Sequence, residues 1–315
     1  MRNFKKVTHG KFFRLVLTQE GRIFINGEAR RYMCGSGYDR SRSVPKFDEF
    51  PGDNYFRIEA GDKLIDCCGG KHYCAVATQN GKIYAAGYVY YRNFEGCRNN
   101  PENNEDYPFE LRLPEGYKAK MIWGSEKCNN MWVTATDADG EMKTLAAGQT
   151  NSLFGHDSEN RSGNFVPIKL PDNHYCIKIA NQGYLVHGVD NNGNLWVWGN
   201  DIYAQNQEDF GSIYEGEYGR DNKPKKVKWF NEQNLKVLDV NSGRRSCVVK
   251  CEDKDGKIVF YGLCQSEDDI KSIGGAGRTT RMLKHYINKI EIDGDRVVSY
   301  AMSWSAVFFL LRPVE

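Results

Sequence analysis

Short apolar runs recur along this chain, and each recurrence has the same order of parts. An apolar run leads into a turn that ends on glycine, and a second apolar run follows and ends on another glycine. A tight hairpin turn needs a positive φ, which glycine adopts at little cost, so each copy predicts a β-hairpin. The turn glycines recur every 53 to 63 residues, which indicates a repeat protein. They are Gly21, Gly81, Gly140, Gly193 and Gly256.

The pattern inside each copy indicates sheets that are covered on both faces. The strand Asn194–Trp198 is apolar on both sides, and neighbouring sheets must therefore cover both sides. A further short apolar strand precedes each later copy, which gives about four strands per repeat, the content of a propeller blade. A sixth copy begins within 297–311 and stops where its turn would be due. The five full copies are 9–27, 69–87, 130–148, 181–199 and 241–262.

We therefore expect an all-β fold, a single β-propeller domain over residues 1–315 with about six four-stranded blades. Five repeats are complete and the last is a half repeat. The ring closes either by pairing of residues 1–8 with the last strands, which we favour because Phe4 and Val7 supply apolar contacts, or by strands from a partner. The residues expected between the blades are Phe24, Ile83, Tyr84, Trp196, Val197, Trp198, Val259 and Phe260.

Three copies carry more specific motifs. The fourth reads Trp198–Asp201 followed by Ala204–Asn206, the second has Gly70–His72, and the third has Ala147–Gln149. This order resembles the regulator of chromosome condensation repeat over essentially the whole chain. The resemblance implies a propeller that usually has seven blades, which is the alternative to six. It also implies one of three roles: guanine-nucleotide exchange on a Ran-like GTPase, a non-enzymatic interaction platform, or a regulatory module attached to a ligase or kinase.

Composition limits the classes of partner that we expect for this protein and the cellular compartment in which we expect it. The net charge is +2, from 43 basic and 41 acidic residues, so nucleic acid is not expected as a direct ligand. No apolar run approaches 18 residues, so we expect no membrane span. Ten cysteines are too few for a disulfide scaffold of this length. Six lie in or beside apolar strands, where we expect buried thiols and a reducing intracellular compartment, cytoplasmic or nuclear, with an organellar or cytoskeletal assembly as the alternative. They are Cys67, Cys68, Cys74, Cys176, Cys247 and Cys251.

The candidates for chemistry are weak. Cys247 and Cys251 would share one strand face, but no second pair follows at the spacing of a zinc site. The glycine-rich segment 274–280 lacks the Gly-Lys-Ser/Thr ending of a phosphate-binding loop, and His72 at the repeat corner fits a structural role. The sequence therefore predicts no catalytic residue, no metal, no cofactor and no enzymatic activity.

Two basic segments are the candidates for partner binding. The first lies between the fourth and fifth copies and combines cations with aromatics, and the second lies in the next loop. Solvated residues that guard blade edges are the alternative, since lysine and proline discourage edge pairing. The candidate residues are Arg220, Lys223, Lys225, Lys226, Lys228, Trp229, Arg278 and Arg281.

Fold alone does not assign a function. A regulatory module needs an attached catalytic domain, for which this chain has no room. Exchange activity in the family is associated with a wedge inserted in one blade, and the intervals after the five hairpins are similar in length. We therefore expect a non-enzymatic protein–protein interaction platform, a subunit or adaptor of a larger assembly. The alternative is an exchange factor for, or binder of, a Ran-like small GTPase.

Overall fold

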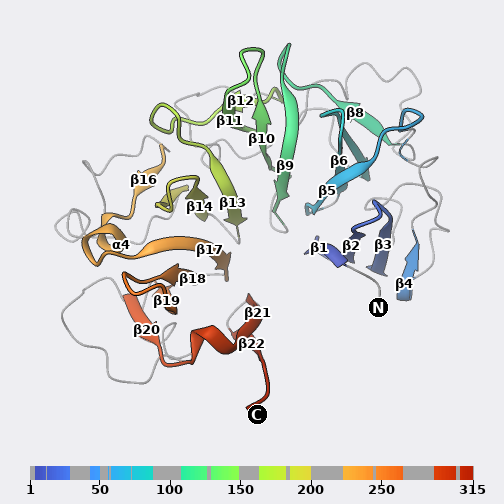
Figure 1. The fold of residues 1–315 in the computed structure, drawn as a ribbon. Coiled ribbons are helices and arrows are strands. Elements are labelled where there is room, and N and C mark those ends of the chain that lie inside the picture. The colour runs from blue at the N-terminus through green and yellow to red at the C-terminus, as the bar shows by residue number, and fades with distance from the viewer. Residues whose placement is uncertain are drawn as a thin grey trace. The chain divides into compact units, whose positions relative to one another are not determined.

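The fold is that of a computed structural model, shown in Figure 1. The chain divides into two compact units, Met1–Tyr175 and Cys176–Glu315, and each is described by itself. The structure describes residues 4–11, 13–28, 43–49, 56, 58–71, 73–87, 108–125, 129–148, 163–181, 185–199, 223–243, 246–264, 287–302 and 306–314.

The first unit contains three four-stranded antiparallel sheets, in which strands that follow one another in the sequence are hydrogen-bonded neighbours. The first blade is β1 (Phe4–His9), β2 (Phe13–Thr18), β3 (Ile23–Glu28) and β4 (Ser43–Glu49). The second blade is β5 (Leu64–Gly69), β6 (Tyr73–Thr78), β7 (Ile83–Gly87) and β8 (Phe109–Leu111). The third blade is β9 (Lys118–Gly124), β10 (Met131–Thr136), β11 (Met142–Ala147) and β12 (Val166–Pro167).

The second unit contains two more four-stranded sheets and one strand pair. The fourth blade is β13 (Cys176–Asn181), β14 (Leu185–Asp190), β15 (Leu195–Gly199) and β16 (Lys225–Lys226), followed by the short helix α4 (Lys228–Glu232). The fifth blade is β17 (Lys236–Ser242), β18 (Ser246–Glu252), β19 (Ile258–Cys264) and β20 (Ile287–Ile290). After a 3-10 turn, η3 (Gly294–Arg296), come β21 (Val297–Met302) and β22 (Val307–Leu311), which we call the half-blade.

The prediction of an all-β propeller is confirmed, whereas the predicted number of four-stranded blades is not. The described residues form five such blades, and the sixth repeat contributes only the two strands of the half-blade. The expectation of one domain over residues 1–315 stays a prediction. Among the described residues, no helix is long and apolar enough to cross a membrane.

The turns form as the glycine pattern predicts. All five turn glycines have φ between +77° and +87°. The residue that begins each turn also closes it with its side chain, because its oxygen accepts the backbone N–H of the residue four positions later. Thr18 Oγ1 accepts from Arg22 at 3.2 Å, and Asp190 Oδ1 accepts from Asn194 at 2.8 Å. Threonine and aspartate are suited to such local bonds, which compete well in turns.

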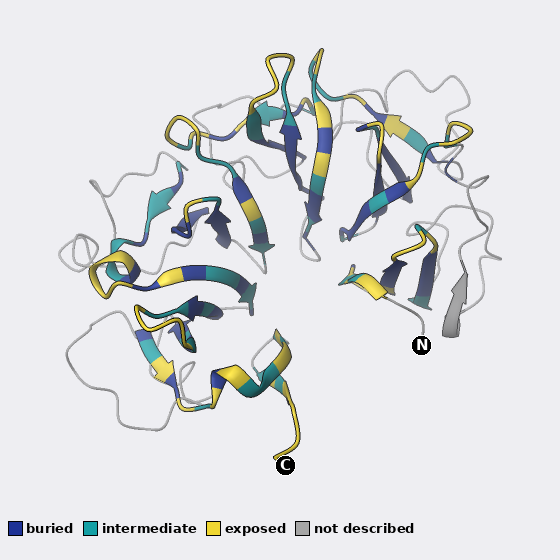
Figure 2. Ribbon diagram, in the orientation of Figure 1, coloured by how far each residue is buried: buried dark blue, intermediate teal, exposed yellow. Residues whose placement is uncertain are grey.

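The core lies between consecutive blades, as Figure 2 shows by the dark blue strands inside each unit. Leu15 and Leu17 of the first blade pack with Leu64 and Cys67 of the second. Of the eight predicted core residues, seven are buried, and Val259 is half-buried against the core between the fourth and fifth blades. The six predicted thiols are all buried and none is in a disulfide.

Candidate protein-binding site

The half-blade packs on the fifth blade with one of its two faces, which we call its back face. Phe260 of the fifth blade is fully buried beneath Tyr300 and Phe309, with ring centroids 5.1 Å from each in edge-to-face geometry. The outer end of the strand pair is also tied together, because the Arg296 guanidinium donates to the carbonyl oxygen of Arg312 at 2.7 Å. These contacts give the strand pair a defined place on the fifth blade.

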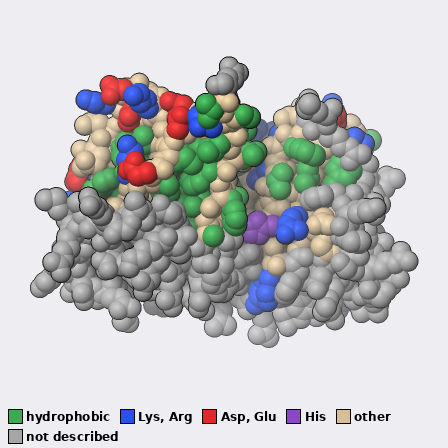
Figure 3. Space-filling view, turned by 90° about the horizontal axis from the view of Figure 1, so that it is seen from below, with side chains coloured by type: hydrophobic (Ala, Val, Ile, Leu, Met, Phe, Trp, Pro, Cys, Tyr) green, Lys and Arg blue, Asp and Glu red, His purple; other side chains and the backbone are tan. Residues whose placement is uncertain are grey.

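The opposite face of the half-blade, its forward face, is exposed and apolar. Val298, Phe308 and Leu310 are 56%, 63% and 62% exposed. Figure 2 shows the half-blade largely in the colours of partial and full exposure. Figure 3, a view from below, shows hydrophobic side chains gathered at the surface among the described residues. Exposed apolar side chains gathered on one face are typical of interaction sites, which makes this face the candidate site.

Strand register shows what this face corresponds to in a complete blade. Phe308 and Leu310 lie opposite Ala301 and Ser299 on β21, as Leu15 and Leu17 lie opposite Thr8 and Lys6 on β1. Leu15 and Leu17 are fully buried, since the second blade covers them. The forward face of the half-blade therefore corresponds by register to the face that the first blade uses to contact the second.

The first strand of the first unit has a similar exposed face. Phe4 and Val7 on β1 are 60% and 63% exposed. By register they match Leu64 and Cys67 on β5, which the first blade buries. Residues 4–9 are hydrogen-bonded to β2, so they form the innermost strand of the first blade itself. The favoured pairing of residues 1–8 with the last strands is therefore not found among the described residues, where β21 and β22 pair only with each other.

Each unit contains one lysine–aspartate pair that connects the innermost strands of two blades. Neither pair was predicted from the sequence. Lys6 Nζ lies 2.7 Å from Asp66 Oδ1, and Lys178 Nζ lies 3.0 Å from Asp239 Oδ1. The four residues hold one repeat position, directly after the register shift in strands β1, β5, β13 and β17. Aligning the strands that precede the hairpins would have revealed this pattern.

The first of these pairs also reaches a third blade. Lys6 Nζ donates to the Ile122 carbonyl at 3.0 Å, and Asp66 Oδ2 accepts the Ile122 N–H at 2.8 Å. The Lys6 ammonium lies 6.0 Å from the centre of the Trp123 ring. Because every group of this network has a partner, we assign it to holding the three blades together.

The first predicted basic segment forms the outer edge of the fourth blade. Lys225 and Lys226 are β16, paired with Val197 and Trp196, and Lys228 forms an ion pair at 3.7 Å with Glu232 on α4. Lys223 lies just before β16 and is half-buried.

Trp229, the aromatic of this segment, is not an exposed anchor. It packs edge-to-face on Phe230 and Tyr261, with ring centroids 5.1 and 5.4 Å away. The structure thus brings Lys223, Lys225, Lys226, Lys228 and Trp229 together, with the aromatic turned into the core. Arg220, Arg278 and Arg281 lie outside the described residues, as do His72 and residues 274–280.

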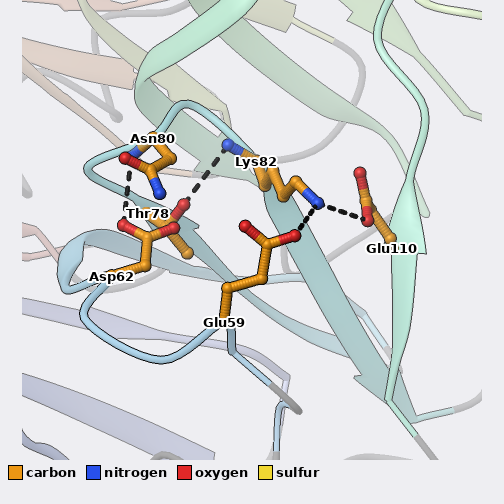
Figure 4. Close-up of polar contacts among 6 residues, drawn as sticks. All are labelled: Glu59, Asp62, Thr78, Asn80, Lys82 and Glu110. Carbon is orange, nitrogen blue, oxygen red and sulfur yellow. Dashed lines mark hydrogen bonds and ion pairs between the residues drawn. The ribbon is translucent and has the colours of Figure 1, made fainter.

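A second charged cluster surrounds the turn of the second blade, as Figure 4 shows. Lys82 Nζ lies 2.6 Å from Glu59 Oε1 and 3.4 Å from Glu110 Oε2. The hydrogen bond to Glu59 raises the pKa of Lys82 above its usual value. Asp62 Oδ1 accepts the N–H of Asn80 at 3.0 Å, which fixes the preceding loop on the same turn. The side chains are largely solvated, and such pairs contribute little to stability.

His187 is the one described histidine that is fully buried. Its Nδ1 lies 2.8 Å from Ser242 Oγ, which joins the fourth blade to the fifth. Burial lowers the pKa of His187 to about 3, so the ring is neutral at physiological pH. In the part of the chain that the structure describes, no group of three or more His, Cys, Asp or Glu residues is arranged to hold a metal ion.

Comparisons with known proteins identify the fold. No protein-family model and no curated protein matches the chain. The crystal structure of human WBSCR16 aligns with a TM-score of 0.68 at 14% identity, over 98% of this chain and 74% of that one. Prp20 of Saccharomyces cerevisiae aligns with a TM-score of 0.52 at 14% identity, over 97% of this chain and 81% of that one.

A second structure of Prp20, described as yeast RCC1 bound to Kap60, has a TM-score of 0.52 at 12% identity, over 96% of this chain and 78% of that one. This chain has the RCC1-type repeat fold. The resemblance of the repeat motifs is thereby confirmed at the level of the fold. In the first blade the second strand is covered by the second blade, whereas Phe308 and Leu310 on the second strand of the half-blade are exposed.

Proposed function

We propose that this protein is a non-enzymatic interaction platform, a subunit or adaptor of a larger protein assembly. The observation that carries the proposal is the forward face of the half-blade, where Val298, Phe308 and Leu310 stay exposed at positions that other blades bury. An apolar surface with the chemistry of a blade-to-blade contact fits a protein partner.

The buried polar groups support a structural rather than a chemical role. His187 is neutral and hydrogen-bonded to Ser242. Asp190 accepts hydrogen bonds from the Asn194 side chain at 2.9 Å and from Trp196 Nε1 at 2.7 Å, so its carboxylate is used within the turn of the fourth blade. The basic segment at the outer edge of the fourth blade stays a candidate second contact, and an intracellular location fits the buried thiols.

Binding of a small GTPase, with or without nucleotide exchange, is the second candidate function. It rests on the likeness to Prp20, whose structure is described together with its binding to Gsp1p and histones. An exchange assay distinguishes the two proposals: labelled nucleotide is loaded on a panel of Ran-like GTPases, and its release is followed with and without this protein. Accelerated release would favour exchange, and unchanged release favours the platform.

Affinity capture from a matched cell extract, read by mass spectrometry, tests the platform directly. The bait is the full chain, compared with the double variant Phe308→Asp/Leu310→Asp. The control is Ile177→Asp, which puts one such carboxylate at a 40% exposed apolar site on another blade. We expect the wild type and the control to retain a common set of proteins that the double variant loses. Retention of the same set by all three would contradict the proposal.

A further inference from the structure

The second strand of the half-blade has one hydrogen-bonding edge beside which the described part of the chain places no strand. In each complete blade the second strand pairs on both sides, as β18 does with β17 and β19. Strand β22 pairs with β21, and among the described residues no strand pairs with its other edge. An open edge exposes a row of N–H and C=O groups that can accept another strand.

The sequence of this edge differs from that of the other sheet edges. Lysine or proline occurs in four of the five outer strands of the complete blades, and the fifth, β8 (Phe109–Leu111), carries the charged Glu110 instead. The four are β4 (Ser43–Glu49), β12 (Val166–Pro167), β16 (Lys225–Lys226) and β20 (Ile287–Ile290). Such residues discourage pairing with another chain. The described residues of β21 and β22 include no charged residue and no proline. The edge of β22 therefore lacks the protection that the other edges have.

The repeat indicates which residue belongs beside β22. By register, Phe309 holds the position of Val16 in the first blade and Val76 in the second. In each complete blade the residue at this position lies directly opposite a large side chain on the third strand. Four of these five facing residues are aromatic and the other is leucine: Phe24, Tyr84, Leu145, Trp196 and Tyr261. Directly opposed side chains on one sheet face are in contact, so this position selects for a large side chain.

Two arginines beside β22 favour a partner segment that carries an acidic residue. Arg312 follows β22 directly and is exposed, and Arg296 lies beside it through their backbone and guanidinium hydrogen bonds. An antiparallel strand on β22 would begin at this end, because antiparallel neighbours run in opposite directions. An acidic residue just before the first apolar residue of that strand would face the Arg312 guanidinium.

We propose that β22 accepts an extended segment of a partner protein as the third strand of the half-blade. The segment runs antiparallel to β22, places an aromatic residue opposite Phe309, and carries an acidic residue near Arg312. The inference rests on the proposed platform function and names the class of partner segment. Main-chain hydrogen bonds supply affinity in such strand addition, and the side chains supply specificity.

The probe is a fluorescent peptide of residues 257–263, the third strand of the fifth blade, carrying Lys257→Glu; Tyr261 supplies its aromatic. Binding to the full-length protein is measured by fluorescence anisotropy. The charge control is the same peptide with the native Lys257, which we expect to bind roughly threefold to tenfold more weakly at low salt, a difference that 1 M salt removes. The variant Arg312→Glu should reverse the preference between the two peptides.

Two further peptides test strand pairing itself. Each carries N-methyl groups on alternate amides, one set per edge of the peptide, and the set that faces β22 should weaken binding by roughly tenfold or more. Hydrogen exchange at residues 307–311 should slow when the unmodified peptide binds. Absence of binding by every peptide, equal binding of all methylated forms, or an unreversed charge preference would overturn the proposal. If these fail while Phe308→Asp/Leu310→Asp still loses its captured partners, the platform function stands without strand addition.

Discussion

Burial of His187 makes the stability of this protein depend on pH above the range in which carboxylates titrate. The ring is fully buried against Ser242, and its pKa falls from an ordinary value of 6.5 to about 3. His187 is therefore protonated near pH 6.5 in the unfolded chain, but only near pH 3 in the folded protein. Stability contributed by neutral His187 is complete above pH 6.5 and is lost as the pH falls below that value.

The size of the effect follows from proton linkage. Each pH unit below 6.5 costs about 1.4 kcal/mol, so between pH 7.0 and 5.5 the free energy of unfolding should fall by about 1.2 kcal/mol through His187 alone. The variant His187→Gln keeps a polar side chain beside Ser242 but has no ring to protonate. Its free energy of unfolding lacks this contribution and should fall by about 1.2 kcal/mol less than that of the wild type over this interval.

Urea denaturation followed by tryptophan fluorescence, at pH 7.0 and at pH 5.5, measures both values. The control is Ile177→Gln, a substitution of a 40% exposed residue that does not titrate, which should keep the pH dependence of the wild type. If the wild type and His187→Gln lose equal stability between the two pH values, the assignment of a neutral buried ring is wrong.

Three other predictions concern the core, the ion pairs and the thiols. Trp198→Ala should cost roughly 3–5 kcal/mol of unfolding free energy, because the ring is fully buried, and a melting temperature that barely moved would contradict the packing. Asp66→Asn should cost roughly 1–3 kcal/mol, since it removes the carboxylate that pairs with Lys6 and leaves that ammonium only the Ile122 carbonyl. Lys143→Met, which removes an exposed pair with Glu141, should cost under about 0.5 kcal/mol, and equal costs would refute the role of the inner pair. All ten cysteines should titrate as thiols in denaturant without reductant, and two or more disulfides would refute the predicted reducing compartment.

The sequence alone predicted the parts of this fold that depend on local chemistry. Turn glycines such as Gly81 and Gly193 require a positive φ, and they have it. Gly262 shows the limit of that inference, because it closes the fifth copy in the sequence but lies within β19 and is not among the glycines of positive φ. Buried strands such as Leu195–Gly199 are apolar on both faces, which identified them as core without further information.

The features that could not be predicted depend on which blades are neighbours. In the sequence, Phe308 and Leu310 do not differ from the apolar strand residues of the other copies. Their exposure depends on tertiary packing, which the sequence pattern does not describe. Trp229 lies in a basic segment that suggested an exposed anchor, yet it packs on Tyr261 from the next blade. The helix α4 that carries it is five residues long, too short for sequence periodicity to identify.

The lysine–aspartate pairs have a consequence for how the repeats find their correct neighbours during folding. Similar blades in one chain can dock out of order, a recurrent failure of repeat proteins. Docking of the second blade on the fifth in place of its own neighbour would set Asp66 against Asp239, and docking of the first on the fourth would set Lys6 against Lys178. Like charges at close range would oppose both errors, so the alternation of sign at this repeat position disfavours docking of two blades that carry the same charge there.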